Sequence, residues 1–147
     1  SFLDTERNYK NYPTNATPNF ASKHNASLVI KHWIEDWKSQ IGLSYNFASG
    51  RNYTDPNKSG FLNEQAKNFN SLNANYAYLI SPQKILYFSI SNVLGTKNVN
   101  EYQYANQTNT DGLFDRRAIT PAADRFFFIG FFWTISDNKN DNQLDNL

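Results

Sequence analysis

Few residues in this chain have the types and spacing that catalysis or metal binding needs. The sequence has two histidines, His24 and His32, and no cysteine. Without an HExxH motif or cysteine partners, two histidines do not supply the ligand set of a zinc site. His32 shares the parity of Leu28 and Ile30 in an apolar stretch, which favours a structural role. No strand end offers a convincing pair of carboxylates for acid–base chemistry. We therefore expect no catalytic residue, no metal and no cofactor.

The C-terminal run DNKNDNQLDNL has a weak similarity to a calcium-binding loop. Asp137 and Asp141 have a suitable spacing, but Lys139 occupies a ligand position and the required glycine is missing. A solvated polar tail over residues 137–147 is the favoured interpretation.

Arginines and a tyrosine in polar connections are the candidates for ligand contact. Arg51 and Tyr53 begin one long connection, and Arg116 and Arg117 follow Asp115 in another. Guanidinium groups bind carboxylates and phosphates through paired hydrogen bonds. These four residues are therefore predicted to contact a ligand or the phosphates of lipopolysaccharide. Salt bridges within the loops are the alternative interpretation of the same charges.

The elements that must position these residues are predicted to be β-strands. The chain has 147 residues, a net charge of +1 and 16% aromatic residues. Aromatic residues suit strands, and the small net charge gives no reason to expect nucleic acid as a partner. Alternation with period two predicts six strands, and no stretch keeps a helical period. The predicted strands are Phe2–Tyr9, Asn25–Ile34, Lys38–Ala48, Ser71–Ile80, Lys84–Leu94 and Arg125–Ser136; NEYQYANQ is a candidate for a short additional strand.

Within these strands, apolar and polar residues fall on opposite sides. Successive strand residues point to opposite faces of a sheet. The apolar sides are predicted to be Ile41, Leu43, Tyr45 and Phe47; Leu72, Ala74, Tyr76, Tyr78 and Ile80; Leu86, Phe88, Ile90 and Leu94; and Phe127, Ile129, Phe131, Trp133 and Ile135.

The predicted connections alternate strictly between short and long. Two are as short as EDW and SPQ, and the other three are long and rich in asparagine. Outer-membrane barrels have this asymmetry, because their periplasmic turns are short and their extracellular loops are long. Strands of about ten residues also match the membrane value. The sequence therefore predicts an all-β fold, an antiparallel transmembrane β-barrel segment.

Aromatic residues are predicted to form belts at the two ends of this segment. Amphipathic rings are enriched where a membrane meets water. The tryptophans are predicted at the short-turn end. The predicted lipid-facing and belt residues are Trp33, Trp37, Tyr45, Tyr78, Phe131 and Trp133.

Three segments resemble the C-terminal end of TonB-dependent outer-membrane receptors. They are KILYFSISNVLGTKNV at 84–99, RRAITPAADRFFFIGFFWTIS at 116–136 and NYPTNATPNFASKHNASLV at 11–29. The likeness is to receptors of Bacteroidetes that carry a carboxypeptidase-like regulatory domain, and it covers nearly the whole chain. Members of that family usually stop at the terminal aromatic strand, whereas this chain continues with DNKNDNQLDNL.

The resemblance implies a bacterial outer-membrane barrel of about 22 strands, plugged by another domain, that imports a nutrient. Residues 1–136 would be its last six strands and 137–147 a periplasmic tail. The implied partners are the rest of the same barrel, its plug domain, the TonB–ExbB–ExbD complex acting through that plug, and outer-membrane lipid. Some relatives also carry a surface lipoprotein lid.

Six strands are too few for a closed barrel, since eight already give an interior that side chains just fill. We therefore expect this chain to be part of a larger receptor. A stand-alone barrel of eight strands is one alternative. The alternative function is that of a soluble or cell-surface β-sandwich that binds glycans on exposed aromatic residues.

Overall fold

Every regular element of the described chain is a β-strand. The computed structural model describes residues 1–135, apart from the side chains of residues 12–14. A membrane-crossing helix is not found among these residues. The all-β prediction is therefore confirmed for the described part of the chain. The predicted tail 137–147, with Asp137 and Asp141, lies outside the described residues, and so does Ser136.

The chain forms two compact units. The first contains Ser1–Ala26, Asn46–Asn70 and Thr96–Asp124, and the second contains Ser27–Tyr45, Ser71–Gly95 and residues 125–135. Most of one large sheet belongs to the second unit, whereas three small two-stranded sheets belong to the first.

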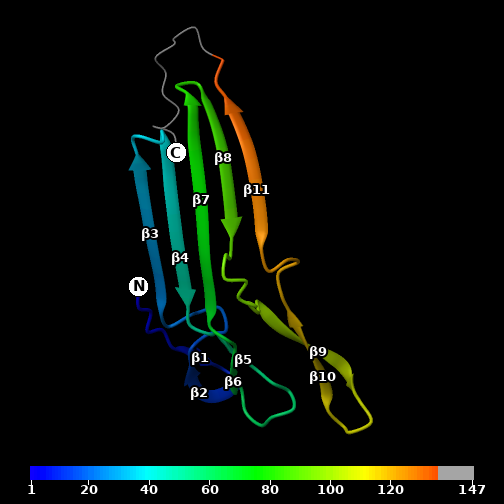
Figure 1. Cartoon of the computed structure of the whole chain (residues 1–147). Helices are drawn as coiled ribbons and strands as arrows, with labels where there is room; N and C mark the ends of the chain where they lie inside the picture. The colour runs from blue at the N-terminus through cyan, green and yellow to red at the C-terminus, as the bar shows by residue number, and fades with distance from the viewer. Residues whose placement is uncertain (136–147) are drawn as a thin grey trace. The chain divides into compact units, whose positions relative to one another are not determined.

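Five antiparallel strands form the main sheet, and their arrows alternate in direction in Figure 1. Their order in space is their order in the chain, so the sheet is a meander. Five of the six predicted strands are confirmed, with small differences at their ends. The strands are β3 (Asn25–Ile34), β4 (Ser39–Ala48), β7 (Phe69–Ser81), β8 (Lys84–Ser91) and β11 (Phe126–Trp133).

Two strand ends are set by residues with positive φ. Lys38 has a φ of 45° and Asn92 a φ of 50°, a left-handed conformation that a strand cannot continue through. The Lys38 amide donates to the Glu35 carbonyl and closes the turn between β3 and β4. The Asn92 amide donates to Asn73 Oδ1 at 2.9 Å. The strand predicted to start at Lys38 therefore begins one residue later, at Ser39. The strand predicted to end at Leu94 ends at Ser91.

The predicted strand Phe2–Tyr9 is wrong. Within it, only β1 (Arg7–Tyr9) is a strand, and it pairs with β2 (Tyr12–Ala16) across a two-residue turn. Phe2 makes an isolated bridge to His24. A local hairpin closes a much shorter loop than pairing with a distant strand does, and so costs less chain entropy. The main sheet consequently has five strands, where the sequence predicts six.

The connections alternate in length as predicted. Residues 35–38 and 82–83 make the short turns, and residues 49–68 and 92–125 the long connections. Because the strands are antiparallel neighbours, the two short turns lie at one end of the sheet, and both long connections start from the other end. The strand β9 confirms the short strand predicted at NEYQYANQ. The long connections carry four short strands. These are β5 (Asn52–Tyr53), β6 (Glu64–Gln65), β9 (Glu101–Thr108) and β10 (Phe114–Ile119).

One face of the main sheet, here called the apolar face, carries most of its large apolar side chains. Tyr76 pairs with Phe88, and Phe88 pairs with Ile129. On β4 the parity follows from Ser39, whose hydroxyl lies 2.7 Å from the Tyr76 hydroxyl. The predicted alternation is thus confirmed within the strands, whereas Leu94 and Ile135 lie beyond the ends of β8 and β11. The face carries Leu43, Tyr45, Tyr76, Tyr78, Leu86, Phe88, Ile90, Phe127, Ile129, Phe131 and Trp133.

The opposite face, here called the mixed face, combines amides, hydroxyls and aromatic rings. Asn73 Nδ2 donates to Ser44 Oγ at 3.2 Å. The Asn75 side chain covers Gly42, where a Cβ would lie 2.5 Å from Asn75 Oδ1. Polar side chains thus connect β4 to β7 on this face as well.

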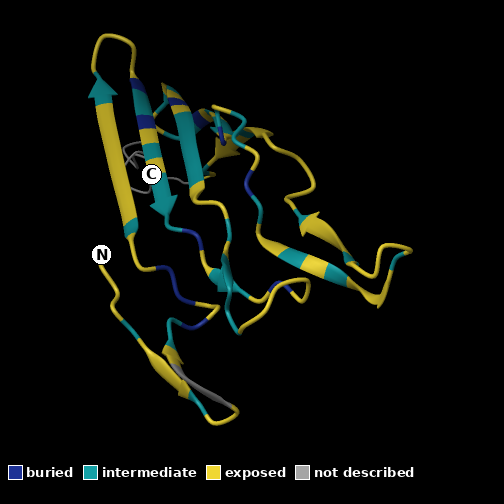
Figure 2. Cartoon of the chain, turned by 90° about the horizontal axis from the view of Figure 1, so that it is seen from below, coloured by how far each residue is buried: buried dark blue, intermediate teal, exposed yellow. Residues whose placement is uncertain are grey.

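No layer covers the main sheet in the described part of the chain. Leu28, Val29 and Ile30 are consecutive in β3 and so point to both faces, yet they are 59%, 61% and 52% exposed. Figure 2 shows few buried residues. The described buried apolar residues are Pro18, Ala21, Ala77 and Ile85. Water-soluble domains bury many more of their large apolar side chains.

Gly130 makes room for three aromatic rings at the β11 edge of the mixed face. Tyr87 pairs with Gly130, and its ring centroid lies 6.2 Å from those of both Phe128 and Phe132. A Cβ at Gly130 would lie 2.9 Å from Phe128 Cε1 and 3.0 Å from Phe132 Cε2. A side chain at this position would therefore push the rings apart.

We predict that Gly130→Val destabilises the folded chain by about 1–3 kcal/mol, the usual cost of overpacking. Urea unfolding of the purified protein in detergent micelles measures the change. In the Gly130→Val background, Phe128→Ala removes the ring nearest to the new side chain and should restore part of the loss. A Gly130→Val variant as stable as its parent contradicts this packing.

Candidate functional site

The candidate site lies in the first unit, where β5, β9 and β10 contribute its side chains. Residues 54–63 join β5 to β6 and are held in one conformation by polar contacts. The Asp55 amide donates to Asn63 Oδ1 at 2.7 Å, and Asn63 Nδ2 donates to the Asp55 carbonyl at 3.0 Å. Lys58 and Glu64 form an ion pair next to these bonds. The loop therefore presents its residues from a fixed backbone.

Asn57 connects this loop to the β9–β10 hairpin. Its Nδ2 donates to the Phe114 carbonyl at 2.9 Å, and its Oδ1 accepts from the Phe114 amide at 2.7 Å. One amide side chain thus pairs with both backbone polar groups of Phe114. Such paired bonds fix orientation as well as distance.

Tyr53, Tyr102 and Arg116 form one cluster. The two ring centroids are 4.9 Å apart. The Arg116 guanidinium carbon lies 4.6 Å from the centroid of the Tyr102 ring, and Arg116 Nη1 donates to the Tyr53 hydroxyl at 3.1 Å. A guanidinium over an aromatic face is attracted by the ring quadrupole. Arg116 therefore holds both rings in place.

Tyr104 extends this cluster along β9. Partial burial raises the pKa of Tyr104 to about 12; the nearby carboxylate of Asp55 acts in the same direction, and Arg116 acts in the opposite one. The Tyr104 hydroxyl oxygen is enclosed and makes no hydrogen bond of ordinary geometry in the part of the chain that the structure describes. Tyr104 is therefore neutral at physiological pH.

Two neighbouring cavities are lined by the first unit alone, and the second of them borders the cluster. The first has a volume of about 360 Å³ and is lined by Arg51 and Lys67 among others. The second has a volume of about 240 Å³ and is lined by Tyr53 and Tyr102. Arg51 lines both. Volumes of this order suit small-molecule sites.

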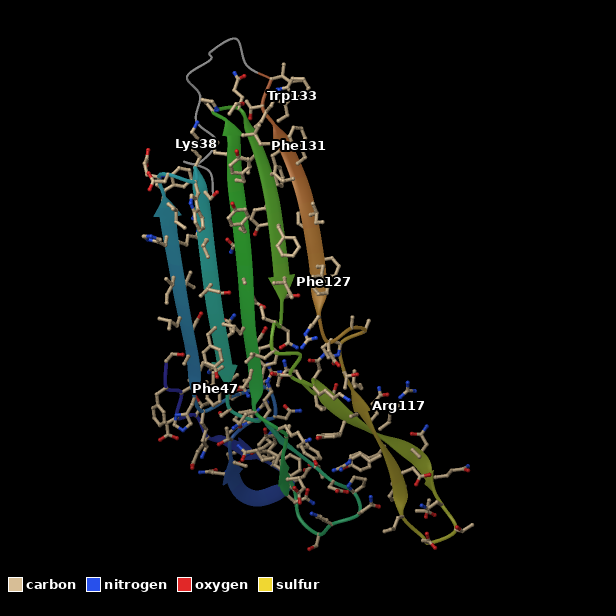
Figure 3. The ribbon with its side chains drawn as sticks, in the orientation of Figure 1. Lys38, Phe47, Arg117, Phe127, Phe131 and Trp133 are labelled. Carbon is tan, nitrogen blue, oxygen red and sulfur yellow. The ribbon has the colours of Figure 1, made fainter. Side chains whose placement is uncertain are left out.

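Of the four predicted ligand-contact residues, the structure gathers three around these cavities. Arg51 and Tyr53 line them, and Arg116 contacts Tyr53. Arg117, labelled in Figure 3, pairs with Gln103 on β9. Because successive strand residues point to opposite faces, its side chain lies on the other side of the hairpin from that of Arg116. Arg117 therefore does not join the cluster.

The predicted belt residues are found along the main sheet. Trp33 lies in β3 next to its last residue, and Trp37 lies in the turn that follows. The Trp33 indole N–H donates to Glu35 Oε2 at 2.7 Å. Trp133 pairs with Lys84 beside the other short turn, and the Lys84 ammonium lies 4.9 Å from the centroid of the Trp133 indole. All three tryptophans therefore lie at the short-turn end.

The other belt residues lie on the apolar face at different heights. Phe131 lies near the short-turn end of β11, close to Trp133, as Figure 3 shows. Tyr78 pairs with Leu86, four positions from the turn residue Pro82. Tyr45 lies toward the long-connection end of β4. That these six residues form two membrane-interface belts stays a prediction.

Neither histidine is part of a metal cluster. The Phe2 ring centroid lies 5.2 Å from that of His24, and His32 is exposed on β3. Among residues 1–135, no group of three or more His, Cys, Asp or Glu residues is placed to hold a metal ion.

Sequence reasoning did not identify several residues of the site. Tyr102 and Tyr104 belong to NEYQYANQ, whose alternation of tyrosine with polar residues was a usable signal. Asn57 and Lys67 gave no signal, because they lie in long connections without periodicity. Their roles depend on contacts between segments far apart in the chain.

Comparison of this chain with protein-family models, with curated proteins and with solved structures finds no match. The class of protein therefore has to be argued from the residues and their arrangement.

We predict that Asn57→Ala loosens the β9–β10 hairpin, because it removes two hydrogen bonds worth about 0.5–1.5 kcal/mol each. Amide hydrogen exchange at Phe114 should speed up by about tenfold. Asn106→Ala on exposed β9 is the matched control and should leave this rate unchanged. Equal rates in the two variants contradict the proposed connection.

Proposed function

We propose that this chain forms part of the wall of a TonB-dependent receptor in a bacterial outer membrane, and that its long connections help to hold the imported nutrient. The assignment to this class, with its plug domain and its TonB–ExbB–ExbD partner, rests on the resemblance of residues 84–99 and 116–136. The membrane location rests on independent features of the sheet.

One observation carries the membrane location: the apolar face is continuous across neighbouring strands and uncovered. Leu86, Phe88, Ile129 and Phe131 are between 39% and 72% exposed although they are neighbours in register. Burying a large apolar side chain contributes about 1.5–3 kcal/mol. In water this contribution would be lost at every one of these positions. Acyl chains would supply it without any protein core.

The two edges of the sheet support the same location. β3 and β11 each have a strand neighbour on one side only in the described chain. An unpaired edge cannot lie in hydrocarbon, because its N–H and C=O groups would lack partners. Further strands of the same barrel would supply those partners. The chain would then contribute five consecutive strands to a larger wall.

The mixed face suits the inside of such a wall. Its amides and hydroxyls bond to one another between β4 and β7, and Phe128 and Phe132 pack with Tyr87 at the β11 edge. Barrel interiors of this kind are polar or filled by a plug. The rings at the β11 edge would contact the plug.

The alternative of a β-sandwich has less support. A sandwich needs a second sheet facing the first across about 10 Å. Apart from the main sheet, the described residues form only two-stranded sheets.

A pair of lysine substitutions on neighbouring residues of β8 tests the proposal. Phe88 lies on the apolar face, and Ser89, the next residue, on the mixed face. A lysine facing lipid near mid-membrane costs about 2–4 kcal/mol. Phe88→Lys should therefore lower the amount of receptor assembled in the outer membrane at least tenfold, measured as protein that resists urea extraction.

Ser89→Lys is the matched control and should assemble within about twofold of the parent, since its side chain would face the interior. Phe88→Ser separates the loss of the ring from the added charge and should assemble better than Phe88→Lys. If the chain is recovered from buffer as a monodisperse monomer and both lysines are tolerated, the proposal fails and the sandwich alternative gains.

A further inference from the structure

Two positive charges in the first unit have no acidic partner among the described residues. Arg51 and Lys67 line the first cavity, and no acidic residue lines it with them. Neither side chain makes an ion pair or a hydrogen bond within residues 1–135. Both side chains belong to exposed residues. Two cations that share a cavity without a counter-charge attract an anion.

Neutral donors complete the surroundings of these cations. Ser49 Oγ accepts a hydrogen bond from the His24 amide at 3.1 Å, which leaves its own proton for a ligand. Asn100 lines the same cavity. Hydroxyl and amide donors next to a guanidinium are the groups that hold carboxylate or phosphate oxygens.

Gly50 keeps the first cavity in its shape. A Cβ at Gly50 would lie 1.8 Å from the Ala66 carbonyl oxygen, so no other residue fits without moving backbone. The Gly50 amide donates to Asn68 Oδ1, and its carbonyl accepts from Gln65 Nε2, both at 2.9 Å. The backbone that carries Arg51 is therefore fixed on both sides.

The second cavity places aromatic surface next to Arg51. Its wall includes Tyr53 and Tyr102, the two rings that Arg116 holds from outside the cavity. Glu101 also lines it. The carboxylate of Glu101 would repel an anion in the second cavity, so the anion belongs in the first one and an uncharged ring in the second.

We propose that these adjoining cavities bind a small molecule in which a carboxylate or phosphate group lies next to a ring. The oxyanion is bound by Arg51 and Lys67, and the ring lies against Tyr53 and Tyr102. Arg116 is a positioning residue. The inference deepens the proposed function by naming a ligand class, although the cavities themselves belong to the first unit and need no membrane.

Calorimetric titration of the purified full chain with four probes tests this inference. The probes are phenyl phosphate, benzoate, inorganic phosphate and phenol. We expect saturable binding of phenyl phosphate or benzoate, at least tenfold weaker binding of inorganic phosphate, and no saturable binding of phenol. The ratio of phenyl phosphate to benzoate affinity distinguishes a phosphate from a carboxylate ligand.

Arginine variants locate the site. Arg51→Gln should weaken binding of the preferred probe at least tenfold, since it removes the charge-assisted hydrogen bonds from the guanidinium to the oxyanion. Arg117→Gln removes the same charge from the other side of the β9–β10 hairpin and should leave affinity unchanged. Tyr53→Ala should weaken phenyl phosphate but leave inorganic phosphate unaffected. Equal effects of Arg51→Gln and Arg117→Gln would overturn the site, as would the absence of saturable binding by folded chain.

These outcomes are separable from those of the proposed function. If the chain binds the probes through Arg51 but remains soluble without detergent, the receptor proposal is contradicted and the ligand site is supported. If the chain assembles in the membrane but does not bind the probes, the receptor proposal is supported and the ligand site is contradicted.

Discussion

The main sheet needs an external partner for its apolar face and for its two edge strands, and the rest of its design follows from that need. Leu86, Phe88 and Phe131 lie side by side on one face without a covering layer. In water, a single sheet of this kind would expose this apolar surface and leave its two edge strands open to pairing with other chains. In the proposed receptor, surrounding lipid and neighbouring strands would meet both requirements at once. Strand length, period-two alternation and the grouping of short turns at one end are what that solution demands.

The mixed face and the long connections have a different task. On the mixed face, small residues make room for larger neighbours, as Gly42 does for Asn75 and Gly130 for the rings around Tyr87. In the first unit, single polar side chains hold separate segments together, as Asn57 does for Phe114. Apolar burial thus has a small part in the connections, where hydrogen bonds and ring contacts fix the groups available to a ligand. Connecting segments commonly carry the residues that bind a ligand.

The sequence predicts the main sheet well because alternation records which side chains share a face. The range Asn25–Ile34 is predicted to the residue, and the faces of β4, β7, β8 and β11 follow from parity. The first strand is wrong because charged residues and a local turn favour a hairpin over long-range pairing. The site is predicted only in part. Arg51, Tyr53 and Arg116 stand out by type, whereas Lys67 depends on packing between distant segments that no local pattern encodes.

The most direct test of the account is the lipid exposure of successive residues in β8. The chain has no cysteine, so a nitroxide label can be placed at each of residues 85–90 in turn without removing a native thiol. In outer-membrane vesicles, we predict that accessibility to dissolved oxygen is high at Leu86, Phe88 and Ile90 and low at the positions between them. Accessibility without this period of two, or high exposure of Leu86 and Phe88 to a water-soluble nickel complex, would contradict the account.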